Sequence, residues 1–136
     1  MNGVHLTADL SGCKAAVAAM TDAHALRDCC LEAVRVAGLR PVGELFHAFP
    51  VPGGVTGAVL LAESHLAVHT WPELGVVTID AFVCNLSTDN AARAEVLVQR
   101  LVEHFQAVAV RRQRLTRGAP GGPAAPPPGG PPRPRA

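Results

Sequence analysis

Four segments with strand-like composition follow one another along residues 41–84, and no helical pattern separates them. These segments span 41–49, 55–62, 65–70 and 76–83, and stretches rich in turn-forming residues interrupt them at 50–54 and 72–75. Strands joined by short turns pair antiparallel, because a parallel pair needs a long crossover connection. This run of strands therefore constrains the chain to a sheet that is mainly antiparallel.

One amphipathic helix is predicted on each side of this run, at about 22–37 and about 90–105. Gly38 follows the first helix in the position where glycine commonly ends one. The candidate N-caps are Thr21 or Asp22 for the first helix and Asp89 or Asn90 for the second. The faces expected to point inward contain Leu26, Cys30, Val34 and Ala37 in the first helix and Val96, Leu97, Leu101 and Val102 in the second.

Two further strands are predicted at the ends of the folded part, at 4–10 and 107–115. The order of elements is then strand, helix, four strands, helix and strand. Many adjacent strands with only two helices predict an α/β (α+β) two-layer sandwich, in which a mainly antiparallel sheet carries both helices on one face.

The C-terminal segment 118–136 consists of eight Pro, five Gly, four Ala and two Arg. A segment without any large apolar side chain cannot compensate for the entropy lost when it becomes ordered, so we expect a disordered Pro/Gly-rich tail. The remaining residues, 1–117, predict one small domain and exclude a large two-domain enzyme.

The charge and the cysteines indicate the class of protein. The formal net charge is +1, without the basic footprint of a nucleic-acid-binding protein. The longest uncharged apolar run, 55–62, is too short to span a bilayer, and residues 1–6 do not resemble the start of a secretory signal. The four cysteines form no CxxC pair and no zinc-like spacing. We therefore expect a cytoplasmic protein with reduced thiols and no membrane association.

Side chains that can carry chemistry are concentrated between Gly53 and Cys84. Each has an ordinary structural interpretation: Cys84 can be a small buried residue, and Ser64 can be a turn residue. His65 and His69, four residues apart, are candidate metal ligands, but no third ligand accompanies them. On these patterns alone the chain is a small α/β domain with a candidate site.

The block from Ala62 to Glu73, AESHLAVHTWPE, resembles the signature of the prokaryotic S-adenosylmethionine decarboxylase proenzymes. The resemblance covers roughly residues 3–115. Flanking matches occur in the same order along the chain, at Gly3-x-His5-Leu6, Phe46-His47-x-Phe49, Gly54-Val55-Thr56-Gly57 and Ile79-Asp80-x-Phe82-x-Cys84.

The resemblance implies a pyruvoyl-dependent enzyme that cleaves itself between Glu63 and Ser64. The products would be a β chain of residues 1–63 and an α chain of residues 64–136, with a pyruvoyl group formed from Ser64 as the cofactor and no metal. His69 is implied as the acid/base of processing, and Thr56 as a supporting hydroxyl. Side chains five residues apart on a regular strand point to opposite faces, so a turn or bulge is expected near Ser64.

The same resemblance implies how the substrate is decarboxylated. The pyruvoyl ketone would form a Schiff base with S-adenosylmethionine, and Cys84 would then protonate the α-carbon, since a thiol is mostly protonated at neutral pH. Phe49 and Trp71 are implied to stack on adenine, and Glu73 to bind the ribose hydroxyls. The product would be the aminopropyl donor for spermidine biosynthesis, made by a homodimer of cleaved protomers.

Two alternatives remain open at this point. The same pyruvoyl machinery could act on arginine or ornithine, although neither has a ring to stack on or a ribose to bind. A non-catalytic dimeric binding domain would require the loss of the nucleophile or the thiol, and the chain has both Ser64 and Cys84.

Overall fold

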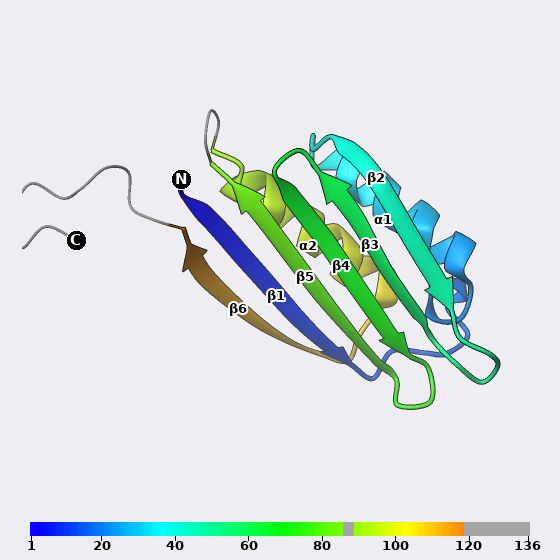
Figure 1. Cartoon of the computed structure of the whole chain (residues 1–136). Helices are drawn as coiled ribbons and strands as arrows, with labels where there is room; N and C mark the ends of the chain where they lie inside the picture. The colour runs from blue at the N-terminus through cyan, green and yellow to red at the C-terminus, as the bar shows by residue number, and fades with distance from the viewer. Residues whose placement is uncertain (86–88, 119–136) are drawn as a thin grey trace, which may run out of the picture.

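The computed structural model describes residues 1–85 and 89–118, and these form a six-stranded sheet with two long helices (Figure 1). The strand order across the sheet is β2-β3-β4-β5-β1-β6, and every neighbouring pair is antiparallel. The strands are β1 (Gly3–Ser11), β2 (Pro41–Ala48), β3 (Val55–Leu61), β4 (Ser64–Trp71), β5 (Val76–Cys84) and β6 (Ala109–Arg117). Residues 119–136, almost all of the predicted tail, lie outside the described residues.

Helix α1 (Ala23–Val36) follows a short 3-10 helix, η1 (Ala18–Met20). The side chain of Asp22 caps α1 by accepting hydrogen bonds from the backbone N–H groups of His24 and Ala25. Gly38 follows the helix with a φ of 74°, a conformation that a residue without Cβ adopts at little cost. Asp22 is therefore the N-cap of the two candidates, and the predicted stop at Gly38 is confirmed.

Helix α2 (Ala91–Phe105) presents a regular stripe of buried side chains to the sheet, formed by Ala94, Leu97, Val98, Leu101 and Phe105. The expectation that Val96 faces inward is wrong, because its side chain is 45% exposed. Val96 lies outside the three- and four-residue spacing of this stripe, so it points away from the sheet. Its neighbour Val98 takes the buried position instead.

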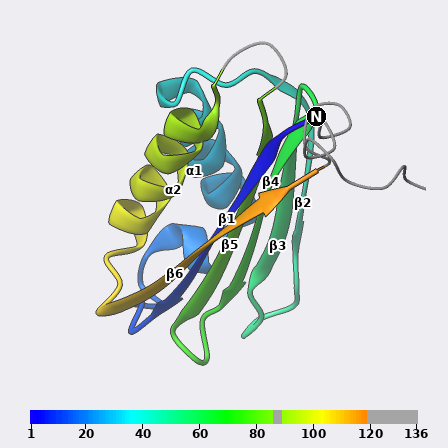
Figure 2. The same ribbon diagram turned by 90° about the vertical axis from the view of Figure 1, so that its left-hand side faces the viewer.

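Both helices cover one face of the sheet, as the edge-on view in Figure 2 shows. The core between the two layers consists mainly of alternate strand residues and the inner faces of α1 and α2. The predicted two-layer α/β sandwich with a mainly antiparallel sheet is therefore confirmed. No helix in the described ranges has the length and apolar character needed to cross a membrane.

The second face of the sheet carries no helix in the described part of the chain, and we call it the open face (Figures 1 and 2). Strand alternation places one set of side chains on this face, while the intervening residues are buried under the helices. We name the two ends of the sheet after β4: the Ser64 end, where β4 starts, and the Trp71 end, where it finishes. The Ser64 end also holds the end of β5, and the Trp71 end holds the end of β2.

Candidate active site

Ser64 follows a tight turn that forces its predecessor into an unfavourable backbone conformation. Leu61 pairs with Ser64 across β3 and β4, so only Ala62 and Glu63 form the turn. Glu63 has a φ of 55°, in the left-handed region that costs a residue with a Cβ about 1–2 kcal/mol. The strained residue is therefore the one whose carbonyl carbon lies in the predicted scissile bond.

Ser64 and Cys84 are neighbours at the Ser64 end of the sheet. The backbone N–H of Cys84 donates a hydrogen bond to Ser64 Oγ at 3.2 Å. Ser64 begins β4 and Cys84 ends β5, so the antiparallel pairing of these strands brings the two residues together. Cys84 is only 6% exposed. The structure thus places a half-buried hydroxyl beside a buried thiol residue 20 positions away in the sequence.

His69 and Thr56 form a second pair, closer to the Trp71 end. They are opposite each other on β3 and β4, and Thr56 Oγ1 lies 3.1 Å from His69 Nδ1, within hydrogen-bond distance. Both side chains are half-buried. The Thr56 hydroxyl therefore helps to orient the His69 ring through Nδ1. The other ring nitrogen, Nε2, can then accept or donate a proton.

A pocket of about 420 Å³ adjoins this pair at the Trp71 end. Its lining contains the three predicted substrate-binding residues, Phe49, Trp71 and Glu73, and its full set is Phe49, Gly53, Gly54, Thr56, His69, Thr70, Trp71 and Glu73. The rings of Trp71 and His69 are tilted by 33° with centroids 6.0 Å apart. Two half-exposed aromatic rings and a carboxylate in one concave site suit a ligand with both a flat ring and hydroxyl groups.

The structure separates these two groups of predicted residues. Strand β4 is continuous from Ser64 to Trp71, so Ser64 and His69 are about 16 Å apart at about 3.3 Å per residue. Alternation also puts them on opposite faces, with Ser64 on the side of the buried Leu66 and Val68. The expected turn near Ser64 is present, but it precedes Ser64 and does not bring it to His69. Within one chain, Ser64 and Cys84 form one half-site, and Thr56, His69, Phe49, Trp71 and Glu73 form another.

Thr70 is a residue of the pocket wall that the sequence analysis missed. It is the buried polar residue of the described core, at 5% exposure. Its hydroxyl donates to the carbonyl of Met20 at 2.7 Å and accepts from the N–H of Val55 at 2.8 Å. Thr70 thereby ties β4 to β3 and to η1 directly behind the pocket. The alternation of β4 was the signal for this burial, since Thr70 shares the face of Leu66 and Val68.

His47 is a second residue that the sequence analysis did not assign. Its ring packs edge-on against Phe49, with centroids 4.8 Å apart and an interplanar angle of 78°. It lies opposite Thr56 on β2 and β3. His47 therefore supports the aromatic wall of the pocket from the side of β2.

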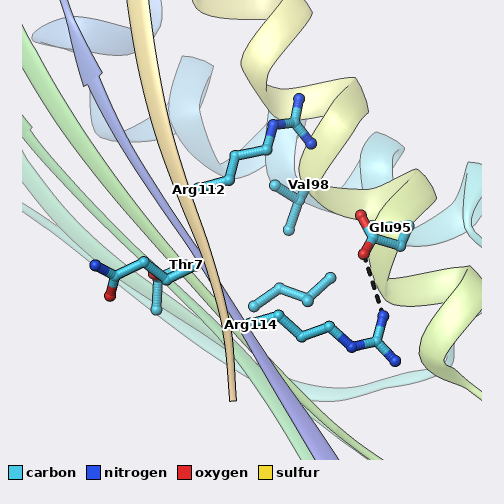
Figure 3. Close-up of a pocket in the computed structure, with 7 residues that line it drawn as sticks. Thr7, Glu95, Val98, Arg112 and Arg114 are labelled. Atoms are coloured by element: carbon cyan, nitrogen blue, oxygen red, sulfur yellow. Dashed lines mark hydrogen bonds and ion pairs between the residues drawn. The ribbon is translucent and has the colours of Figure 1, made fainter.

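A separate, smaller cavity of about 140 Å³ lies between α2 and the β1/β6 pair (Figure 3). Arg114 reaches across it to Glu95 at 3.4 Å, and Arg112 donates a hydrogen bond to Gln99. Because both arginines are engaged with α2, they hold the edge strand β6 to the helix layer. None of the predicted site residues lines this cavity.

The remaining thiols and carboxylates form no metal-binding group in the part of the chain that the structure describes. In residues 1–85 and 89–118, no three His, Cys, Asp or Glu side chains are grouped so that they could hold a metal ion. Burial raises the pKa of Cys13 and Cys30, and it raises the pKa of Cys29 to about 12. These three thiols are therefore structural in character, since a thiol must ionise to act as a nucleophile.

Comparisons with known proteins agree with the resemblance found in the sequence. The family model described as S-adenosylmethionine decarboxylase matches residues 4–118. An S-adenosylmethionine decarboxylase proenzyme of Archaeoglobus fulgidus is 37% identical over 85% of this chain and 97% of its own length. One from Acetivibrio thermocellus is 35% identical over 81% and 87% of the two chains.

A solved structure agrees as well. The crystal structure of the adenosylmethionine decarboxylase from Aquifex aeolicus superposes with a TM-score of 0.79 at 28% identity, covering 90% of this chain and 96% of that one. The family predicted from the block at residues 62–73 is thus confirmed by sequence and by fold. The chain belongs to the S-adenosylmethionine decarboxylase family.

Proposed function

We propose that this chain is a proenzyme that cleaves itself between Glu63 and Ser64 and then decarboxylates S-adenosylmethionine. The observation that carries the proposal is the position of Ser64, directly after the left-handed Glu63 and hydrogen-bonded to the backbone of Cys84. A strained turn, a hydroxyl and a thiol residue meet at one point in a chain that belongs to this family.

Cleavage uses groups that the chain itself supplies. Ser64 Oγ attacks the carbonyl carbon of Glu63, so that the acyl group moves from nitrogen to oxygen and the amide becomes an ester. Removal of the Ser64 α-proton expels the Glu63 carboxylate and leaves a carbon–carbon double bond at residue 64. This enamine tautomerises to an imine. Water then hydrolyses the imine at the α-carbon of residue 64, which releases ammonia and leaves the ketone. The His69 imidazole, whose Nδ1 is within hydrogen-bond distance of Thr56 Oγ1, is suited to remove the α-proton of Ser64.

Position 64 fits the pyruvoyl group that this chemistry would produce, because its side chain is half-buried and lies next to Cys84. A pyruvoyl group at this position supplies a ketone that binds the substrate amine and accepts the electrons released with carbon dioxide. In this proposal the Cys84 thiol returns a proton to the α-carbon. The pocket residues Phe49 and Trp71 hold the adenine ring, and Glu73 holds the ribose hydroxyls.

A second copy of the chain completes the site in this proposal. A substrate bound to Ser64 cannot extend about 16 Å along β4 to reach the pocket beyond His69 of the same chain. A two-fold dimer formed through the open faces, with its axis running across the strands, would bring the pocket of one protomer to the Ser64 end of the other. The open face offers large apolar side chains for such a contact, since Leu45, Leu60 and Leu115 are 76%, 54% and 56% exposed.

The test of cleavage is the mass of the purified protein. We expect two chains, residues 1–63 and 64–136, and an α chain that resists N-terminal sequencing. The Ser64→Ala variant should stay a single chain of 14.1 kDa, because alanine has no oxygen to accept the acyl group. The matched control is Ser11→Ala, at an exposed serine at the end of β1, which should cleave as the wild type does. An uncleaved wild-type chain would refute the proposal.

The test of the substrate is carbon dioxide release from S-adenosylmethionine, arginine and ornithine, each offered alone. The pocket favours the adenosyl compound, because two aromatic rings have no partner on arginine or ornithine. If carbon dioxide is released from arginine or ornithine as fast as from S-adenosylmethionine, the result would support the alternative, in which the enzyme acts on a basic amino acid.

A further inference from the structure

Phe82 is the centre of a cluster on the open face at the Ser64 end. The His5 ring approaches it edge-on with centroids 6.5 Å apart, the His65 ring lies 5.7 Å away, and the guanidinium carbon of Arg117 is 5.8 Å from the ring centroid. A Cβ at Gly3 would lie only 2.7 Å from the ring. The Phe82 ring therefore leans across Gly3, and only glycine leaves it room there.

Gly3 also shows how close this cluster is to the reacting residues. It pairs with Cys84 on one side and with Arg117 on the other, so β1 alone separates those two residues. Phe82 precedes Cys84 by two residues on β5, and His65 directly follows Ser64 on β4. The guanidinium over the Phe82 ring thus lies on the open face, at the same end of the sheet as Ser64 and Cys84.

Arg117 is a cation without a carboxylate partner within the described structure. Every Asp and Glu of the chain lies in residues 1–85 or 89–118, and none of them forms an ion pair with Arg117. The one carboxylate in the cluster, Asp80, accepts from His5 Nε2 at 3.2 Å. A guanidinium stacked over an aromatic ring keeps its N–H groups at the edge of its plane, where they can bind both oxygens of a carboxylate.

We propose that Arg117 binds the α-carboxylate of the substrate, with Phe82 as the residue that holds the guanidinium in place. The inference rests on the proposed function: once the substrate amine is bound at position 64, its carboxylate is two bonds away from that nitrogen. A two-pronged hydrogen bond from Arg117 orients this carboxylate. The product no longer has a carboxylate, so Arg117 contributes to substrate binding and not to product binding.

The experiment compares ligands with and without the carboxylate. S-adenosylmethionine and its decarboxylated product are titrated into the uncleaved Ser64→Ala protein and into the same protein carrying Arg117→Gln, so that processing does not enter the measurement. We expect Arg117→Gln to weaken S-adenosylmethionine binding by about 10- to 100-fold, as for the loss of a charge-assisted hydrogen-bond pair, and to change product binding less than two-fold. Arg117→Lys should give an intermediate loss.

The matched control is Arg111→Gln, because Arg111 is on the same face of the same strand but faces Asp9 on β1. It should leave both affinities unchanged. Equal losses for substrate and product in the Arg117→Gln protein, or no loss for either, would overturn the role of Arg117. Failure of the wild-type chain to cleave or to release carbon dioxide would instead refute the proposed function, so the two failures are distinguishable.

Discussion

The roles proposed for Ser64 and Cys84 require different surroundings. In the proposed cleavage Ser64 attacks the carbonyl of Glu63, whose left-handed backbone conformation is unfavourable. In the proposed mechanism Cys84 donates a proton to the substrate, and its burial at the end of β5 shields it from bulk water. The hydrogen bond from the Cys84 N–H to Ser64 Oγ holds the two residues side by side.

The proposed role of Cys84 predicts a particular failure in the Cys84→Ala variant. Cleavage should proceed, but decarboxylation should fall by about 100-fold or more, as for the loss of a general acid. Misplaced protonation should also convert the α-chain terminus from pyruvoyl to alanine, which intact mass during turnover detects. Cys29→Ala, at a thiol whose burial raises its pKa to about 12, is the control and should keep its activity. Full activity in Cys84→Ala would exclude the thiol as the proton donor.

At the scale of elements, local patterns predicted most of the fold. Both helices and all six strands lie within about two residues of their predicted ends, because alternation, caps and turn residues act over a few positions. The start of the last strand shows how far a prediction from local patterns can be displaced. Gln106 ends α2 in a left-handed conformation, and β6 begins only at Ala109, two residues later than predicted.

Contacts between distant strands could not be predicted in this way. Ser64 and His69 are five residues apart in the sequence, yet the regular strand between them places them in different half-sites. Ser64 and Cys84 come together, and Cys84 and Arg117 come to lie on either side of Gly3, only through the registers of β4, β5, β1 and β6. Register is a property of paired strands, so no single segment reveals it.

Thr70 on β4 links the pocket wall to β3 and to η1 through two hydrogen bonds. Removing its hydroxyl should therefore lower the stability of the whole domain. Thr70→Val keeps the shape but leaves the carbonyl of Met20 and the N–H of Val55 without their partner. Each unsatisfied buried group costs about 1–3 kcal/mol, so we expect the free energy of unfolding to drop by about 2 kcal/mol or more. Urea denaturation measures this drop.

The matched control for Thr70 is Thr78→Val. Thr78 lies on the neighbouring strand, but its side chain is on the open face and only half-buried. Its stability should change by about 0.5 kcal/mol or less. Equal losses in both variants would mean that the two hydrogen bonds of Thr70 do not stabilise this layer contact.

At the scale of the whole molecule, the sheet explains why so small a chain would act as a dimer. One face is covered by α1 and α2, as Figure 2 shows. The open face carries exposed leucines and the side chains of Thr56 and His69, whereas the Ser64 side chain points to the helix side at the end of β4. The residues that cooperate in the proposed mechanism lie near opposite ends of the same sheet. In the proposed dimer, a two-fold axis that lies between the paired open faces and runs across the strands exchanges those ends, so that two incomplete sites would become two complete ones.

This arrangement predicts that two inactive variants restore each other. Ser64→Ala cannot form the ester, and His69→Ala lacks the imidazole that moves the α-proton, so each should remain uncleaved alone. In a mixed dimer, one site combines Ser64 and Cys84 of the His69→Ala chain with Thr56 and His69 of the Ser64→Ala chain. Refolding the two together from denaturant should therefore cleave the His69→Ala chain alone, to about half of its molecules if the chains pair at random.

Different affinity tags on the two chains allow mass analysis to identify which one is cut. The control mixes Ser64→Ala with a chain carrying both Ser64→Ala and His69→Ala, in which no site contains the serine and no cleavage is expected. Absence of cleavage in the Ser64→Ala and His69→Ala mixture, when successive purification on the two tags shows that mixed dimers have formed, would mean that Ser64 is processed by its own chain. The strand between Ser64 and His69 would then have to break its regular course, because an intact β4 keeps the two side chains on opposite faces.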